Sequence, residues 1–259
     1  MAIELKLNEK QGHWILAKVG KKVLRPGGRE LTQILIRNLN INPSDDVVEF
    51  APGLGFTASL ACAGNPKSYT GVDRNQEAVS LVRKNVHYPH MKVIVAEAAA
   101  STLPDACATK VYGEAMLTMQ PLEDKKAIIH EAARILKPGG LYGIHELALQ
   151  PDNIGEDIKQ NLYKDLSSNI RVHARPLTRA EWSRLLEEEG FTIINVDTNA
   201  MALLELKRIL RDEGFFRTLR IMFNVLRFRE LRGRILNMRQ VFSQHKKNMS
   251  AVAIVARKM

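Results

Sequence analysis

The chain has 259 residues, of which 45% are hydrophobic and 25% are charged, and its formal net charge is +10 at pH 7. These are globular values, and a chain of this length can bury a sizeable core. No apolar run approaches the roughly 18–20 residues of a membrane span, and Met1 to Lys10 lacks the apolar centre of a signal peptide, so we expect a soluble cytoplasmic protein.

Residues 10–39 have the spacing of two amphipathic helices. Ile15, Val19 and Val23 share one helical face, and a second stripe holds Leu31, Ile34, Leu35 and Leu39. Between the two lies the break Arg25-Pro26-Gly27-Gly28, in which two glycines permit positive φ. The break is either a plain helix–helix turn or a lid loop whose backbone faces a ligand, and the sequence leaves both readings open.

Residues 47–57 show the order strand, tight turn, helix. The β-branched pair Val47-Val48 leads into a bend that contains Pro52, Gly53 and Gly55, and a short helix is expected from Thr57. This order lets the backbone approach a ligand closely at the carboxyl end of a parallel sheet.

Asp73 ends the second expected strand, residues 68–73. It lies about twenty residues beyond the glycine turn, where a carboxylate can accept hydrogen bonds from ribose hydroxyls. Its alternative role is to cap the following helix, residues 75–85. Because strand and turn precede it in the correct order, we favour the ligand role.

Strands and helices alternate through the rest of the chain. We expect strands at 91–96, 110–116, 141–149, 191–196 and 250–256, with helices at 122–136, near 154–166, and after the capping box of Thr178 and Glu181. Helical patterns in 201–248 interrupt the alternation. The order predicts a Rossmann-like α/β fold: a mostly parallel sheet with helices on both faces, N-terminal helices, and a helical insertion before the last strand.

Five motifs follow one another between residues 45 and 144. They are Glu49-Phe50-Ala51-Pro52-Gly53-Leu54-Gly55, Gly71-Val72-Asp73, Ala96-Glu97-Ala98 with Leu103-Pro104, Glu114-Ala115-Met116, and Leu136-Lys137-Pro138-Gly139-Gly140. As an ordered set they resemble the class I S-adenosylmethionine-dependent methyltransferases, particularly the small-molecule branch, whose first motif is acid-x-Gly-x-Gly-x-Gly. Three positions depart from the family pattern: Ala51 replaces a glycine, Glu97 replaces an aspartate, and Lys110 occupies an often acidic position.

The resemblance implies a seven-stranded sheet in a single domain covering 1–259. Within it, residues 1–40 would form a helical lid, 45–150 the cofactor-binding core, and 151–176 and 199–248 the substrate side. S-adenosyl-L-methionine would be the methyl donor and S-adenosyl-L-homocysteine the product. No metal site is expected: the spacing of Cys62 and Cys107 matches none, and we expect both to be core thiols.

The resemblance also assigns cofactor contacts. Asp73 would hold the ribose hydroxyls, Arg74 would pack near the adenine, and Glu97 and Ala98 would fix the adenine edge. Glu49 sits in an apolar strand, where an unpaired carboxylate is costly to bury, so its partner would be the cofactor ammonium or a local Lys or Arg. The remaining implied contacts are Gly28, Thr32, Ala51, Gly53, Gly55, Glu114 and Ala115.

His145 is the candidate general base, because a histidine titrates near neutral pH and this one follows the centre of the fifth strand. Its alternative is a hydrogen-bonded structural role. Glu114 is the second catalytic candidate, with a binding role as its alternative. Methyl transfer needs a base only where the acceptor loses a proton, and positioning can supply most of the acceleration.

The basic excess is local, since residues 201–248 hold 12 Lys or Arg against 4 Asp or Glu. Aromatic and arginine residues interleave there: Phe215, Phe216, Met222, Phe223 and Phe228 with Arg217, Arg220, Arg227 and Arg229. This pattern fits an apolar acceptor tunnel with a cationic mouth, a helix that touches an anionic membrane, or ordinary helices with one solvated face.

The sequence carries no recognisable nucleic-acid-binding module, so we place small-molecule or lipid-like acceptors ahead of RNA. Two other classes stay open. A nicotinamide-dependent oxidoreductase also uses a glycine turn and a distant acid, although its Gly-x-Gly-x-x-Gly is poorly met by Ala51, Gly53 and Phe56. The other is a non-catalytic cofactor-binding protein that docks through its basic helices.

Overall fold

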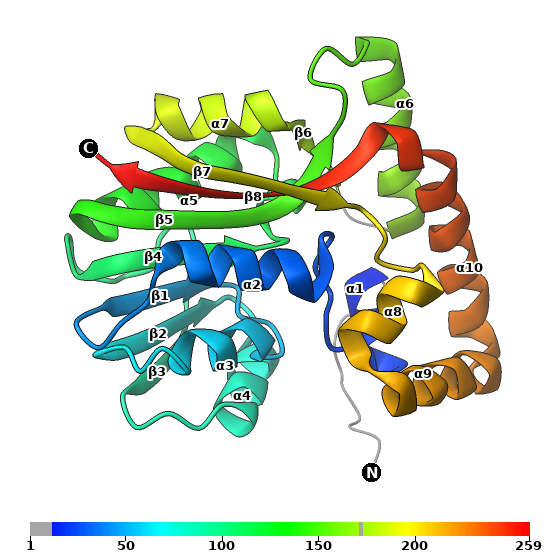
Figure 1. Ribbon diagram of the computed structural model, residues 1–259, viewed down its shortest axis with the longest axis horizontal. Coiled ribbons are helices and arrows are strands. Elements are labelled where there is room, and N and C mark those ends of the chain that lie inside the picture. Colours follow the sequence, from blue (N-terminus) through cyan, green and yellow to red (C-terminus); the bar gives the residue numbers. More distant parts are fainter. Residues whose placement is uncertain (1–11, 171–172) are drawn as a thin grey trace.

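The computed structural model describes residues 12–170 and 173–259. Its centre is a sheet of eight strands in which seven follow the order β3-β2-β1-β4-β5-β8-β7 (Figure 1). These are β1 (Asp46–Phe50), β2 (Ser68–Asp73), β3 (Met91–Val95), β4 (Ala108–Glu114), β5 (Leu136–Leu149), β7 (Phe191–Ala200) and β8 (Met249–Lys258). The two-residue β6 (Leu177–Thr178) pairs with the end of β5.

Strands β1 to β5 run parallel to one another, whereas β8 runs antiparallel to both β5 and β7. This confirms the mostly parallel α/β fold and the helical insertion before the last strand. One register differs from expectation. Residues 136–140 were expected to lie outside the strand, but Leu136 already pairs with Ala108, and an irregularity follows before Lys110 pairs with Leu141.

Helices cover both faces of the sheet. On one face, α2 (Gly28–Leu39), α3 (Phe56–Cys62) and α4 (Gln76–Asn85) pack their apolar stripes on a cluster that includes Leu35, Val79 and Val255. On the other, α5 (Leu122–Ile135) and α7 (Arg179–Glu188) pack on a cluster around Phe50 and Trp182. The capping box expected at the start of α7 is present.

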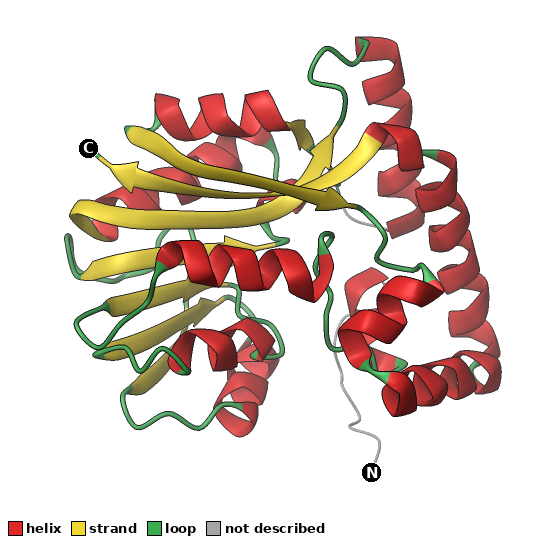
Figure 2. Ribbon diagram, in the orientation of Figure 1, coloured by secondary structure: helices red, strands yellow, loops and turns green. Residues whose placement is uncertain are grey.

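The remaining helices gather beyond the carboxyl ends of the parallel strands, where one end of the molecule is helical (Figures 1 and 2). They are α1 (Gly12–Lys18), α6 (Glu156–Ile170), α8 (Leu206–Glu213), α9 (Phe215–Arg227) and α10 (Arg229–Gln244). No helix within the described residues combines the length and apolar composition needed to cross a bilayer.

Two helical expectations need correction. The first helix ends at Lys18, so both valines are buried outside it: Val19 lies in the turn that follows the helix, and Val23 lies in the next segment, where its N–H donates to Glu213 of α8. The pattern of the expected helix near 154–166 placed Ile158 on one apolar stripe with Leu162 and Leu166, but in α6 Ile158 is 41% exposed while Leu162 and Leu166 are buried. Residues 1–11 of the expected lid lie outside the described part of the chain.

Candidate active site

A cavity of about 1080 Å³ lies at the carboxyl ends of the parallel strands, next to the helical end of the molecule. Its wall includes eight of the expected cofactor residues: Ala51, Gly53, Asp73, Arg74, Glu97, Ala98, Glu114 and Ala115. Five other candidate residues lie outside this wall and have other neighbours: Gly28, Thr32, Glu49, Gly55 and His145.

The glycine turn presents bare backbone to the cavity. Gly53 has φ +58°, and a Cβ added there would meet only the Ala51 carbonyl oxygen, at 3.9 Å. Ala51 itself has φ +54°, and its N–H donates to the carbonyl of Val72 at 2.8 Å. A non-glycine residue in this region is strained, and such strain collects at ligand sites.

Gly55 has a packing role instead. With φ +81°, a Cβ at this position would lie 2.7 Å from the Cγ2 atom of Val86. The absence of a side chain therefore lets the start of α3 lie against the end of α4, as the third glycine of a nucleotide-binding turn commonly does.

Asp73 is 9% exposed and ends β2 at the cavity wall. Its Oδ1 accepts the Asn75 N–H at 2.9 Å, while Asn75, not Asp73, caps α4. Burial raises the pKa of the Asp73 carboxyl, and the backbone N–H groups of Asn75 and Gly53 oppose that shift. Asn75 therefore fills the helix-capping role considered for Asp73, and Asp73 lies in the cavity wall.

Glu114 is buried at the end of β4 and accepts hydrogen bonds from four side chains. Thr32 Oγ1 donates at 2.6 Å, His145 Nδ1 lies at 2.7 Å and Arg25 Nε at 3.2 Å, and Thr57 Oγ1 is the fourth donor. Burial alone raises the pKa of Glu114, but the Arg25 charge and the hydrogen bonds from His145 and Thr32 outweigh it and hold the pKa at about 2. The carboxylate is ionised and its oxygens are fully engaged.

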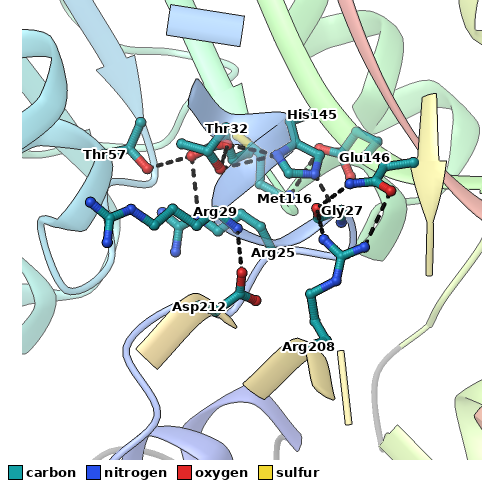
Figure 3. Close-up of polar contacts among 12 residues, drawn as sticks. Arg25, Gly27, Arg29, Thr32, Thr57, Met116, His145, Glu146, Arg208 and Asp212 are labelled. Carbon is teal, nitrogen blue, oxygen red and sulfur yellow. Dashed lines mark hydrogen bonds and ion pairs between the residues drawn. The ribbon is translucent and has the colours of Figure 1, made fainter. Parts of the chain in front are cut away.

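His145 is fully buried, and it lies next to Gly27 of the first loop (Figure 3). Its Nε2 accepts the Gly27 N–H at 3.1 Å, which requires the neutral tautomer with the proton on Nδ1, and Nδ1 then donates to Glu114. Both nitrogens are engaged and neither reaches the cavity. The geometry gives His145 the structural role that the sequence left as its alternative.

Glu49 lies on the face of the sheet that packs on α2 and α3. Its Oε2 accepts the hydroxyls of Tyr69 at 2.5 Å and Tyr112 at 2.7 Å, and the residue is 1% exposed. Burial raises the pKa of Glu49 to about 7 despite both hydroxyls. Its hydrogen-bond partners within the described residues are thus two tyrosines rather than a Lys or Arg, and Glu49 is outside the cavity wall. Tyr112 is its register partner on β4, a relation visible only once the strands are paired.

Helix α8 holds the Arg25–Gly28 loop from outside. Arg208 Nη1 donates to the Gly27 carbonyl at 2.7 Å, and Asp212 Oδ1 accepts the Arg29 N–H at 3.0 Å. A Cβ at Gly28 would lie 2.8 Å from both side chains. Gly28 is therefore required for the contact with α8, while Leu24, Arg25 and Pro26 form the part of the loop that lines the cavity.

The other half of the cavity is apolar. Its wall comes from α1, from the first loop, from the segment after β7 and from α10: Trp14, Leu16, Leu24, Met201, Leu203, Met238 and Phe242. The aromatic residues of α9 are absent from this wall, and Phe215, Phe216 and Phe223 are 61%, 85% and 62% exposed. The expectation that the aromatic residues of α9 line an acceptor tunnel is therefore wrong, and α10 contributes apolar surface to the cavity instead.

The wall suits S-adenosylmethionine. Carboxylates at Asp73 and Glu97 flank an open glycine backbone, as a ribose and an adenine amino group require, and the buried cation Arg25 lies beside Glu114 at the same end. The sequence did not single out Arg25 or Thr57 as site residues. The only available signal was their place in the loop and in the first turn after the glycines.

A family model described as a methyltransferase domain matches residues 47–140. An uncharacterized protein of Haemophilus influenzae is 34% identical over 95% of this chain and 98% of its own length. A probable S-adenosylmethionine-dependent methyltransferase of Mycolicibacterium smegmatis is 30% identical over 57% of this chain and 52% of its own.

Among solved structures, geranyl diphosphate C-methyltransferase from Streptomyces coelicolor, solved with Mg²⁺, geranyl diphosphate and S-adenosyl-L-homocysteine, superposes with a TM-score of 0.63. The likeness covers 88% of this chain and 77% of that one at 13% identity, so it speaks for the fold alone.

The two glycines of the turn make a matched pair of substitutions. Gly55→Ala combines left-handed strain with a clash on Val86 and should destabilise the protein by about 2–4 kcal/mol. Gly53→Ala meets no close atom and should cost only about 1–2 kcal/mol while its methyl group enters the cavity. Denaturant unfolding and titration with S-adenosylhomocysteine separate the two: an equal loss of stability would contradict the packing role of Gly55.

Glu49→Gln should change how stability depends on pH. The folded chain keeps the Glu49 proton up to about pH 7, while an unfolded chain releases it near its ordinary value of 4.5. The contribution of Glu49 to folding stability is therefore fully present below about pH 4.5, and it is lost as the pH rises through about 7. The glutamine variant should gain about 2–3 kcal/mol on the native protein between about pH 5 and about pH 8, measured by urea unfolding. Parallel stability curves would show that Glu49 is ionised throughout.

Proposed function

Because the chain belongs to the class I S-adenosylmethionine-dependent methyltransferases, we propose that it transfers a methyl group to a small-molecule or lipid-like acceptor that is largely apolar. The observation that carries this proposal is the single cavity, in which a polar half around Asp73 and Glu97 continues into an apolar half bounded by α1 and α10. A nicotinamide-dependent oxidoreductase is not favoured, because the antiparallel β8 departs from the all-parallel dinucleotide order and the family match is to methyltransferases.

The polar half would hold the cofactor. Asp73 would accept from the ribose hydroxyls, Glu97 and Ala98 would contact the adenine edge with Arg74 beside it, and Ala51 and Gly53 would offer close backbone approach. Glu114 and Ala115 would lie at the methionine end, where the buried positive charge of Arg25 would suit a carboxylate. Thr32 and Thr57 would act one step away, because both donate to Glu114 and fix its position.

S-adenosylmethionine supplies an electrophilic methyl group when bound. The chain's own contribution is to align the acceptor and exclude water, which suits a displacement that disperses charge. The cavity is lined in part by side chains that cannot hydrogen-bond to water: Leu24 and Pro26 of the loop, and Leu147 of the sheet.

A base for an acceptor proton would come from a residue other than His145 or Glu114, since both are saturated by internal hydrogen bonds. Arg175 N–H donates to the Thr118 carbonyl at 2.8 Å, and this contact places His173 beside the segment that leads to Asp124. Both His173 and Asp124 are in the cavity wall. We assign them as the candidate titratable groups on the acceptor side.

Asp73→Ala should weaken binding of S-adenosylhomocysteine by roughly ten- to a hundredfold, because charge-assisted hydrogen bonds to the ribose are lost. Asp157→Ala, an exposed acid on α6, is the matched control and should leave affinity unchanged. Isothermal titration calorimetry measures both, with NADH as a second titrant. Unchanged affinity in Asp73→Ala would remove that residue from the site, and tight NADH binding without S-adenosylhomocysteine binding would favour the oxidoreductase.

Transfer of a labelled methyl group into a metabolite and lipid extract tests the activity itself. We expect label in the organic phase, since the acceptor half is apolar. With the labelled acceptor in hand, His173→Gln should lower kcat by roughly 10²-fold. Persistent absence of transfer by a chain that binds the cofactor would favour a non-catalytic binding protein, and an unchanged kcat in His173→Gln would exclude that residue as the base.

A further inference from the structure

Helix α9 carries an apolar face that no described part of the chain covers. The helix has 13 residues, and six large apolar side chains on it are between 46% and 85% exposed. They are Phe215, Phe216, Leu219, Met222, Phe223 and Leu226. Exposed apolar residues in such a contiguous group mark an interaction surface, whereas scattered ones carry no such meaning.

The six residues occupy one continuous arc of the helix, distinct from its packed side. At 100° per residue, Met222, Phe215, Leu226, Leu219, Phe223 and Phe216 follow one another around the axis. The packed side is formed by the buried Thr218 and Ile221, and Asn224 Nδ2 donates to the carbonyl of Val19 at 3.0 Å. The exposed arc is therefore additional to the face that holds α9 on the protein.

Positive charge borders this arc. Arg227 and Arg220 follow Phe216 around the helix axis and are both exposed. Between Gly214 and Arg229 the chain has four arginines and no Asp or Glu. An apolar arc of Phe and Leu beside a row of arginines is the composition of helices that lie in the headgroup layer of anionic membranes.

We propose that α9 docks the protein on an anionic lipid surface, with its apolar arc in the acyl boundary and its arginines on lipid phosphates. Charge complementarity favours lipid over a second copy of the chain, since the same face of another copy would bring arginines and no carboxylate. The helix lies at the edge of the helical end of the molecule, where a flat surface can reach it (Figure 1).

The docking helix and the cavity share one apolar cluster. Ile221 of α9 packs in a group with Leu16 and Met238, and these two residues line the apolar half of the cavity. A membrane contact at α9 would thus lie one helix layer from the proposed acceptor site. The proposal does not depend on the acceptor, because it is carried by the exposed arc and the arginines that border it.

Sedimentation with lipid vesicles tests the proposal on the full chain. Binding should be strong to vesicles of phosphatidylcholine with phosphatidylglycerol and weak to phosphatidylcholine alone. The double variant Phe216→Ser with Phe223→Ser should lower the partition coefficient at least about tenfold on anionic vesicles. Arg220→Gln with Arg227→Gln should lower it about fivefold per arginine, with little effect on neutral vesicles.

The matched control changes one exposed apolar residue and one exposed arginine elsewhere, Ile158→Ser on α6 with Arg184→Gln on α7, and should bind as the native chain does. All variants should keep native affinity for S-adenosylhomocysteine, which shows that the fold and the cofactor site are intact. This readout separates failure of docking from failure of the proposed enzyme function.

Three results would overturn the proposal. The first is absence of binding to anionic vesicles, and the second is native binding by the double phenylalanine variant, which would assign attraction to general surface charge. The third is a lipid-free dimer, seen by sedimentation velocity, that Phe216→Ser and Phe223→Ser dissociate. That result would make the arc a contact between copies of this chain.

Discussion

The buried carboxylate of Glu114 is the interaction on which the site depends. Its donors come from four separate segments: Arg25 from the first loop, Thr32 from α2, Thr57 from α3 and His145 from β5. Because an uncompensated buried charge is strongly destabilising, these segments are held in one mutual arrangement. The loop over the cavity, the helix after the glycine turn and the centre of the sheet are thereby fixed relative to the end of β4, where the reacting end of the cofactor would lie.

A second constraint joins distant parts of the chain. Helix α8, from the late insertion, holds the first loop through Arg208 and Asp212, and its last residue, Glu213, accepts the N–H groups of Lys22 and Val23, both at 2.8 Å. The insertion therefore shapes both halves of the cavity: α8 positions the loop on the cofactor side, and α10 lines the acceptor side.

For two residues, the sequence correctly indicated that a polar partner is needed but not which partner supplies the contact. Glu49 does need compensation for its burial, but two tyrosine hydroxyls supply it, and Glu49 does not line the cavity. His145 does lie close to the site, but the Gly27 N–H and the Glu114 carboxylate engage both of its nitrogens. In each case the residue type predicted that a polar partner exists. The identity of the partner depends on which strands and loops become neighbours, and a single sequence does not contain that information directly.

The sequence by itself determined the order of strands and helices, the α/β class, the glycine turn and the methyltransferase family, because these follow from local periodicity and short contiguous motifs. It also placed Asp73, Glu97 and Ala98 at the ends of strands, and parallel strands bring such ends to one edge of the sheet. Only the tertiary structure decided which side chains face the cavity. The central strands are buried on both faces, so apolar alternation cannot show that Glu49 turns away from the ligand while Asp73 turns toward it. The exposed arc of α9 was likewise undecided, since an amphipathic pattern predicts an apolar face but not whether another part of the chain covers it.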